Sequence, residues 1–315
     1  MPQQTTSKEL GFGSHASLGG QRLMNRNGSA NVKRIGGPYI SASDVFHQLT
    51  TMTWGRFLLL VLGGYLIANI LFAFGYYFAG IEYLNIQPSG SFFSDYLECF
   101  FFSTQCFTTI GFGRVNPQGI SSNVLASIEG LVGLLSLAMA TGLLYGRFSR
   151  PRAHLLHSDN ILIAPYRENM NAVMFRIAST RRHSILIDNN VSLSLGYNYE
   201  ENGSTKRRFF FLNLELDKIN FLSSSWTLVH PITEDSPLWG MSYETIIKSR
   251  TEFMVLFKAL EETTSQTVLE RFSYFVDEIV WGAKFESMIG TLPDGKPSLN
   301  INLLNSWKEA ELNVV

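Results

Sequence analysis

The sequence has 315 residues, 25 basic and 26 acidic side chains, a formal net charge of −1 and a pI near 6.6. This length suffices for about two domains, and the balance of charge gives no reason to expect nucleic acid as a partner. The two cysteines, Cys99 and Cys106, are expected to be small buried apolar residues without a metal or redox role.

Residues 1–40 are rich in Gly, Ser, Asn and Gln and contain few large apolar side chains. A segment of this composition buries too little surface to offset the entropy that it loses on ordering. We therefore expect a flexible N-terminal arm. Since no early basic and apolar series is present, we do not expect a secretory signal.

From Ser43 to Trp54, apolar side chains recur at helical spacing, with Ser43 or Asp44 as the N-terminal cap. This pattern predicts an amphipathic helix on the cytoplasmic surface of a membrane. A simple extension of the following span is the alternative. The helix opens a domain that we assign to residues 41–152.

Two long stretches are apolar enough to cross a membrane. Residues 57–81 contain no charged side chain, and residues 124–146 contain Glu129 alone. Since a helix of about 20 residues spans the hydrocarbon core, we predict spans at about 56–80 and 122–148.

Basic residues gather before the first span and after the second, whereas the segment between the spans has Arg114 as its one basic residue. The flanking residues are Lys33, Arg34, Arg56, Arg147, Arg150 and Arg152. Because basic loops stay in the cytoplasm, we expect a multi-pass protein of the cell membrane with both termini cytoplasmic. The cluster of Arg147, Arg150 and Arg152 is also a candidate site for anionic lipid, with an orientation signal alone as the alternative.

The segment between the spans contains the aromatic run 95–108, which is too short to cross. It predicts a re-entrant pore helix, which is tolerated at membrane depth where it is buried in protein or lines a water-filled cavity. The polar run 108–113, TTIGFG, follows it. Glycine at every second position permits the backbone conformations that point successive carbonyl oxygens at one axis.

This run resembles the selectivity filter of potassium channels, in which the carbonyl oxygens of four identical loops replace the hydration shell of K⁺. The ion-binding residues would be Thr109, Ile110, Gly111, Phe112 and Gly113, with K⁺ itself held at Thr109, Ile110, Gly111 and Phe112. The hydroxyl of Thr109 would add a ligand, and the ring of Phe112 would hold the width of the loop. An ordinary glycine turn is the alternative.

In the second span, Leu137, Thr141 and Tyr145 lie four apart on one stripe. If this stripe faces the axis, four Tyr145 rings can gate the cytoplasmic mouth by steric closure or dewetting. Glu129 is a functional candidate because it is a charge within a span. A carboxyl group that is hydrogen-bonded behind the pore helix is its alternative reading.

After residue 153 the pattern changes to short runs of alternating hydrophobicity, among them 191–195, 212–216, 226–232 and 278–288. Eight or so such runs, broken by polar turns, predict an immunoglobulin-like β-sandwich over residues 153–315. The whole chain is then an α+β membrane protein with two spans, a pore helix and a cytoplasmic regulatory domain.

No enzyme is indicated by these residues. The six histidines show no metal-ligand spacing, and no nucleophile lies beside a convincing base. We expect no cofactor, with K⁺ as the transported ion.

Together, the filter, the two spans and the predicted sandwich look like the inwardly rectifying potassium channels, and in particular their prokaryotic branch. The likeness extends from about Ser43 to Met288, and its further stretches are Ala140–Leu143, Arg147–Ala153, Phe175–Ile177, Leu228–Ile232, Asp235–Leu238 and Trp281–Phe285. The resemblance implies a homotetramer with a passive, lipid-regulated potassium pathway. It also implies gating at the second-span helices and in the cytoplasmic domain, where segment 259–265 resembles the loop that narrows the pore.

Three departures from the family pattern bear on function. Phe112 stands where tyrosine is usual, and Gln105 stands where glutamate is frequent, so an ion pair from there to Arg114 is not available. Leu137 occupies the cavity position that is acidic in strong rectifiers, which argues against strong rectification. The residues expected to support the filter are Gln105, Arg114 and Glu129.

Two other functions stay open at this point. A membrane-tethered β-sandwich could sense a ligand or lipid without conducting, although it would need no glycine-spaced filter. A weakly selective pore for Na⁺ and K⁺ would differ only in how rigid the filter is.

Overall fold

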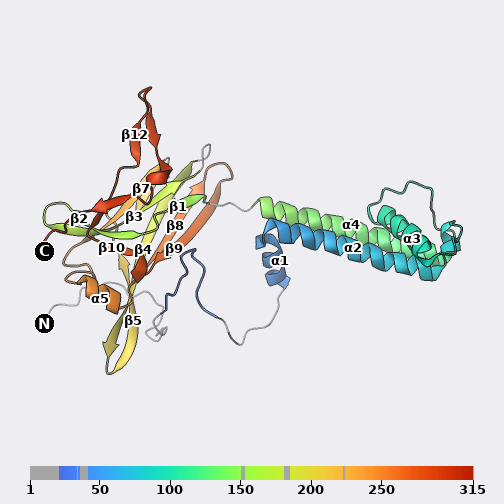
Figure 1. Cartoon of the computed structure of the whole chain (residues 1–315), viewed down its shortest axis with the longest axis horizontal. Coiled ribbons are helices and arrows are strands. Elements are labelled where there is room, and N and C mark those ends of the chain that lie inside the picture. The colour runs from blue at the N-terminus through green and yellow to red at the C-terminus, as the bar shows by residue number, and fades with distance from the viewer. Residues whose placement is uncertain are drawn as a thin grey trace. The chain divides into compact units, whose positions relative to one another are not determined.

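A computed structural model describes residues 21–33, 35, 42–149, 153–180, 185–222 and 224–314. The chain divides into two compact units. One is Gly36–Arg150, and the other joins Met1–Ile35 to Pro151–Val315. The first unit is helical and the second is mostly β-structure (Figure 1).

The helical unit contains α1 (Ala42–Thr51), α2 (Trp54–Ala79), the 3₁₀ turn η1 (Ile81–Leu84), α3 (Phe92–Phe107) and α4 (Ile120–Phe148). Helices α2 and α4 have 26 and 29 residues with mean hydropathy of 2.4 and 1.8, which is long and apolar enough to cross a membrane. Helix α3 begins three residues before the predicted pore helix. Its start is stabilised by Asp95, whose carboxylate accepts a hydrogen bond of 2.8 Å from the N–H of Ser89.

Helices α2 and α4 run side by side, and α3 packs against them at one end (Figure 1). Their shared core contains Ala73, Tyr76, Ile81, Leu84, Cys99, Phe102 and Val115. Many large apolar side chains of α2 and α4 point away from this core, for example Leu59 and Leu131. An outward apolar surface of this kind suits contact with lipid or with other membrane helices.

The β unit is a sandwich of two five-stranded sheets. The first sheet has the order β1 (Leu155–His157), β3 (Met170–Ser179), β2 (Ile161–Tyr166) and β10 (Ile279–Trp281), with β7 (Ser225–Ile232) also paired to β3. The second has the order β5 (Ser204–Leu212), β4 (Leu186–Glu201), β8 (Glu252–Glu261) and β9 (Gln266–Tyr274), with β6 (Lys218–Leu222) also paired to β4. All these pairs are antiparallel except β10 with β2.

One hydrophobic core lies between the two sheets, and it includes Ile161, Val173, Phe175, Leu193, Phe253, Phe257, Phe272 and Tyr274. The smaller elements are α5 (Tyr243–Lys248), η2 (Val276–Glu278), β11 (Ala283–Phe285) with β14 (Trp307–Glu309), β12 (Ile289–Thr291) with β13 (Pro297–Leu299), and η3 (Ile301–Leu303). The predicted α+β class, with membrane helices and a β-rich C-terminal part, is confirmed.

Two predicted strands differ from the structure. The run 212–216 is not a strand. Strand β5 ends at Leu212, and residues 213–217 connect it to β6, because the carbonyl of Asn213 accepts a hydrogen bond from a side chain, the ring of His230. The run 278–288 is broken into β10 and β11 by Gly282, whose φ of +70° turns the chain.

Residues 21–33, which we call the N-terminal strap, contact the β-sandwich, although the sequence suggested that they belong to a flexible arm. The N–H groups of Leu23 and Met24 donate to the carboxylate of Glu252 at 2.9 to 3.0 Å. Glu252 also pairs with Arg207 at 2.7 Å, and both side chains are fully buried. Composition underestimated the ordering because polar hydrogen bonds, not apolar burial, hold the strap.

Candidate functional site

The run after α3 has the backbone that its glycines predicted. Thr109, Gly111 and Gly113 have φ values of +59°, +53° and +80°, so every second residue is left-handed. Such alternation lets successive carbonyl oxygens face the same side of a loop. The side chains between them, Ile110 and Phe112, are 59% and 78% exposed. The loop therefore continues from the end of α3 as an irregular segment whose backbone oxygens could face an ion.

Contacts from α3 hold the base of this loop. The N–H of Ile110 donates to the carbonyl of Gln105 at 3.0 Å. The side-chain oxygen of Gln105 accepts a weak bond of 3.4 Å from the N–H of Phe112. Arg114 forms an ion pair with Glu98 on α3. Because this pair is largely exposed, it contributes little, about 0 to 1 kcal/mol.

Glu129 lies behind α3, in a buried network that joins all three long helices. The hydroxyl of Tyr76 on α2 donates to its carboxylate at 2.6 Å, and the hydroxyl of Ser103 on α3 donates to its other oxygen. Ser103 also lies 3.1 Å from the side-chain oxygen of Asn69 on α2. These four side chains are fully buried. The network therefore ties the pore helix to both spans by hydrogen bonds that water does not reach.

Gly133 lies one turn after Glu129 and allows α4 to approach the end of α3. A Cβ atom on Gly133 would lie 2.2 Å from the carbonyl oxygen of Phe107, the last residue of α3. No other residue fits there, since the obstacle is backbone rather than a movable side chain. Gly130 and Gly142 on the same helix have no atom within 4 Å of such a Cβ.

The stripe on α4 faces away from α2 and α3. Leu137 and Tyr145 are 66% and 75% exposed, and Thr141 is exposed as well. The hydroxyl of Thr141 donates to the carbonyl of Leu137 at 2.9 Å, so it is held against its own helix. Tyr145 makes no aromatic contact with α2 in the described residues. The stripe is therefore free to line a shared axis or to meet lipid.

Arg147 contacts α1. Its guanidinium donates to the carbonyls of Leu49 and Met52 at 2.7 and 2.8 Å and lies 4.6 Å from the rings of Trp54 and Phe57. These contacts fix the turn between α1 and α2 against the end of α4. The guanidinium predicted to bind lipid is thus engaged within the protein. Arg150 and Arg152 lie outside the residues that the structure describes.

In the β unit, the segment 259–265 comprises the last three residues of β8 and the turn 262–265 that leads into β9. The carboxylate of the fully buried Glu261 accepts hydrogen bonds from the N–H groups of Thr263 and Thr264 at 3.2 and 2.9 Å. This bonding gives the turn a fixed shape. Among the described residues, no group of three or more His, Cys, Asp or Glu side chains could hold a metal ion.

None of the partners in the network around Glu129 was predicted from the sequence. Asn69 and Ser103 were polar residues inside apolar runs, which is the signal that could have identified them. The partner Tyr76 carried no such signal, because tyrosine is common in membrane helices. The sequence also does not reveal the close approach at Gly133, because a glycine in a membrane helix can serve either packing or bending.

Comparisons with known proteins agree with this architecture. Residues 155–313 match the inward rectifier potassium channel C-terminal domain, and residues 63–150 match the ion channel family. The inward rectifier potassium channel Kirbac3.1 of Paramagnetospirillum magnetotacticum is 39% identical over 282 residues, which cover 89% of this chain and 93% of that protein. The G protein-activated inward rectifier potassium channel 4 of Bos taurus is 27% identical, over 92% of this chain and 73% of that protein.

A more distant relative is the ATP-sensitive inward rectifier potassium channel 12 of Gallus gallus, 25% identical over 85% of this chain and 67% of that protein. These relatives are ion channels and not enzymes, and they place the chain in a membrane. The predicted family is confirmed by a domain match that covers half of the chain and by a relative that covers most of it. The chain belongs to the inward rectifier potassium channel family.

Proposed function

We propose that this chain assembles as a homotetramer that conducts K⁺ passively and selectively across the cell membrane. The observation that carries the proposal is the left-handed backbone at Thr109, Gly111 and Gly113 directly after α3. One loop presents carbonyl oxygens from one side only. Four loops around an axis surround the ion and replace its hydration shell, so a cyclic tetramer follows from the chemistry of the site.

In this arrangement, K⁺ passes along the backbone oxygens of Thr109, Ile110, Gly111 and Phe112, and the hydroxyl of Thr109 is its innermost ligand. The C-terminal end of α3 directs the negative pole of its dipole toward the cavity below. The network around Glu129 supports this mechanism, because it holds α3 at a fixed distance from both spans. A rigid pore helix keeps the filter at one width.

We place the gate at Tyr145, since its exposed ring is the bulkiest side chain on a stripe with Leu137 and Thr141. Four rings around the axis would exclude a hydrated ion. The β unit would add a second control at residues 259–265, where Glu261 at the end of β8 fixes the shape of the turn into β9. Both termini would lie in the cytoplasm, on the side of the flanking basic residues.

Anionic lipid would act at Arg150 and Arg152, each contributing about 1 kcal/mol of attraction to an anionic leaflet. Arg147 would have a different task. Its guanidinium already holds the α1 to α2 turn, so it would transmit movements of the interfacial helix to α4.

A weakly selective pore for Na⁺ and K⁺ is the second candidate. It is favoured by the single long contact of 3.4 Å between Gln105 and Phe112, and by the phenylalanine ring, which offers no hydroxyl to anchor the loop. A filter held this loosely would adapt to the smaller ion.

Purified protein in liposomes tests the proposal through K⁺ flux measured against Na⁺ and choline, with barium as blocker. Gly111→Ala should abolish the flux while the tetramer persists, because Gly111 has a φ of +53° and a side chain in this left-handed region costs about 1 to 2 kcal/mol, which displaces the loop from its ion-facing conformation. Gly130→Ala is the matched control, since Gly130 has an ordinary helical backbone and no atom lies within 4 Å of the added Cβ. Unchanged K⁺ over Na⁺ selectivity in Gly111→Ala would refute the filter assignment.

A further inference from the structure

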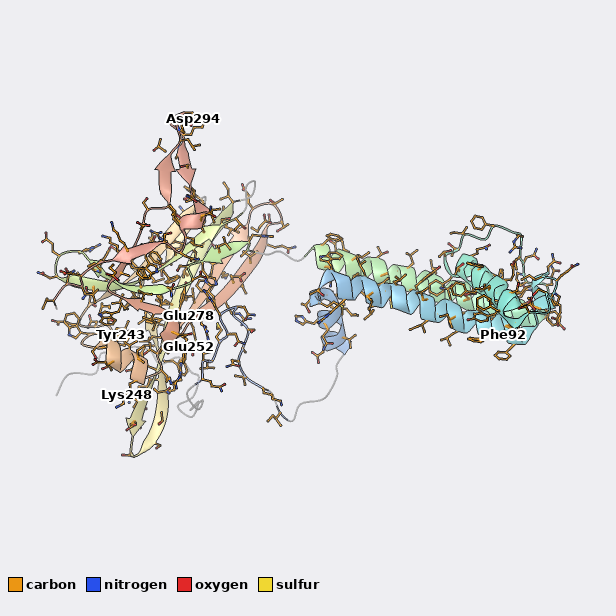
Figure 2. All side chains as sticks on the ribbon, viewed as in Figure 1. Phe92, Tyr243, Lys248, Glu252, Glu278 and Asp294 are labelled. Carbon is orange, nitrogen blue, oxygen red and sulfur yellow. The ribbon has the colours of Figure 1, made fainter. Side chains whose placement is uncertain are left out.

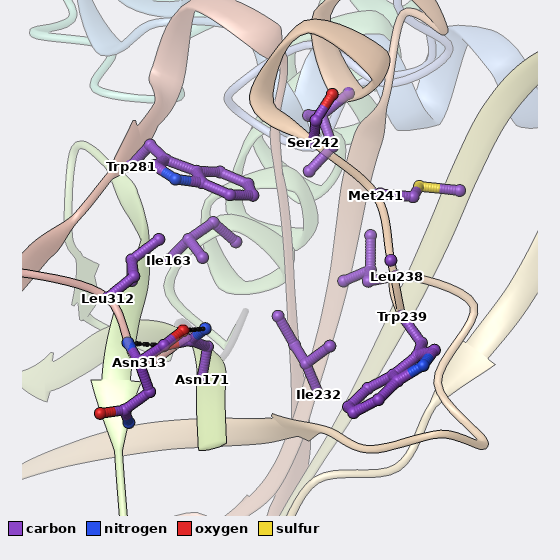
Figure 3. Close-up of a pocket in the computed structure, with 12 residues that line it drawn as sticks. Ile163, Asn171, Ile232, Leu238, Trp239, Met241, Ser242, Trp281, Leu312 and Asn313 are labelled. Carbon is purple, nitrogen blue, oxygen red and sulfur yellow. Dashed lines mark hydrogen bonds between the residues drawn. The ribbon is translucent and has the colours of Figure 1, made fainter. Parts of the chain in front are cut away.

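The β unit contains a cavity of about 330 Å³ that shares no residue with the proposed filter or gates. It lies between the first sheet, the loop that leads into α5 and the C-terminal segment (Figure 3). Twelve residues line it, and none of them carries a charge. A cavity of this size reaches the lower range of natural ligand pockets, about 300 to 1,000 Å³.

Aromatic and aliphatic side chains form the walls. Figure 3 shows the indoles of Trp281 and Trp239 on opposite sides of the hollow, with Ile163 and Ile232 between them. Trp239 is 40% exposed and lies at the edge of the cavity. The rings of Trp281 and Tyr243 pack edge-on with their centroids 6.1 Å apart, and this contact fixes the plane of the indole ring. Two indole faces favour a flat, apolar guest by offset or edge-to-face contact.

The loop that carries Trp239 is held in place before any ligand arrives. His230 is buried, and its ring lies 2.9 Å from the hydroxyl of Ser236 and 2.7 Å from the carbonyl of Asn213. The N–H of Trp239 donates to the carbonyl of Ser236 at 3.0 Å. This bonding fixes the cavity wall, so little ordering entropy is lost on binding.

One end of the cavity is polar. The amide of Asn171 donates to the backbone carbonyl of Asn313 at 3.0 Å and accepts from its N–H at 3.0 Å (Figure 3). A carboxamide offers two donor hydrogens and two acceptor lone pairs, and these two bonds use one of each. The remaining donor and acceptor of Asn171 can meet one polar group of a guest.

We propose that this cavity binds a small uncharged aromatic molecule of one or two rings that carries a single hydrogen-bonding group. The lining without charge excludes ionic ligands, because an unpaired charge is costly to desolvate. The volume suits the rings, since a dry apolar cavity of about 150 Å³ already holds benzene. This inference goes beyond the proposed function and adds a ligand site in the cytoplasmic domain.

The test is a titration of 5-fluoroindole into the full channel in lipid nanodiscs, followed by fluorine-19 NMR, with empty nanodiscs as baseline. We expect saturable binding to the parent. Leu312→Trp fills the cavity and should weaken the affinity by about tenfold or more. Leu269→Trp is the matched control, because that side chain is 60% exposed on β9 and should leave the affinity unchanged. A charged analogue, 5-fluoroindole-3-acetate, should bind about tenfold more weakly or worse.

Two results would overturn the proposal. Equal affinity in Leu312→Trp and the parent would mean that the molecule binds elsewhere. No saturable binding to the parent would mean that the cavity is closed to solutes or filled by a side chain of a second copy. Trp281→Ala gives an independent check, since loss of one aromatic wall should weaken binding without filling the space.

Discussion

Replacing Gly133 with alanine tests whether the packing of α4 against the end of α3 sets the geometry of the filter. The added Cβ would lie 2.2 Å from the carbonyl oxygen of Phe107, whereas ordinary contact begins at 3.4 Å. The two helices must therefore separate locally by about 1.2 Å. Because the obstacle is backbone, no rotamer change relieves it, and overpacking of this kind costs about 1 to 3 kcal/mol.

The displaced residue, Phe107, is separated from Thr109, the first residue of the proposed filter, by Thr108 alone. A cost of about 1 to 3 kcal/mol corresponds to a loss of roughly 5- to 150-fold in the population with an intact filter. We expect the K⁺ flux in liposomes to decrease by the same factor, roughly 5- to 150-fold. The tetramer, followed by size-exclusion light scattering, should persist, because the contacts between the helices elsewhere are unchanged.

Gly130→Ala is the matched control. It lies on the same helix with no atom within 4 Å of the new Cβ, so it should keep the flux of the parent and gain up to about 1 kcal/mol of helix stability. If Gly133→Ala conducts like the parent and unfolds at the same temperature, close packing of α4 on α3 does not hold the filter.

Four further perturbations follow from the structure. Tyr145→Ala should raise basal K⁺ flux without loss of selectivity, because the side chain is 75% exposed and its removal widens the proposed gate without disturbing the packing of α4. Reduced flux in a stable tetramer would place the gate elsewhere. Arg147→Lys keeps the positive charge but loses the forked hydrogen bonds to the carbonyls of Leu49 and Met52, so it should lower the K⁺ flux. Arg150→Lys also keeps its charge and should conduct normally. Equal flux in the two variants would mean that Arg147 acts through its charge alone. Glu252→Gln leaves a buried guanidinium unpaired and should destabilise the β unit by about 3 to 5 kcal/mol, with faster hydrogen exchange at the N-terminal strap; protected strap amides would contradict this. Burial lowers the pKa of His230, so the unfolded chain takes up its proton first as the pH falls through 6.5. Stability should therefore decline below that pH, and His230→Gln should show a shallower decline in thermal unfolding between pH 7.5 and 5; an equal decline would exclude this histidine.

Local patterns decided much of this protein. A stretch of about 20 or more residues with few or no charged side chains predicts a membrane helix, because a charged side chain in the hydrocarbon core costs free energy. Both spans follow from this rule alone. Glycine spacing predicted the conformation at Gly111 and Gly113, since few other residues take a positive φ without cost. Period-two alternation predicted the sandwich, but it did not identify β2, whose first four residues are all buried and do not alternate, and it joined residues 278–288 across the turn at Gly282.

Tertiary structure decided everything that depends on partners far apart in the chain. Glu129 and Tyr76 are 53 residues apart, and Arg22 of the strap lies 256 residues from Glu278. The spacing of such residues along the chain does not predict that they make contact, because the tertiary fold, and not the local backbone, sets the distance between their side chains. The same reason applies to Arg147, whose contacts with α1 and α2 do not follow from its position beside a span. Sequence therefore determined which segments are long and apolar enough to cross the membrane and where the proposed filter lies, and packing determined what holds that loop in shape.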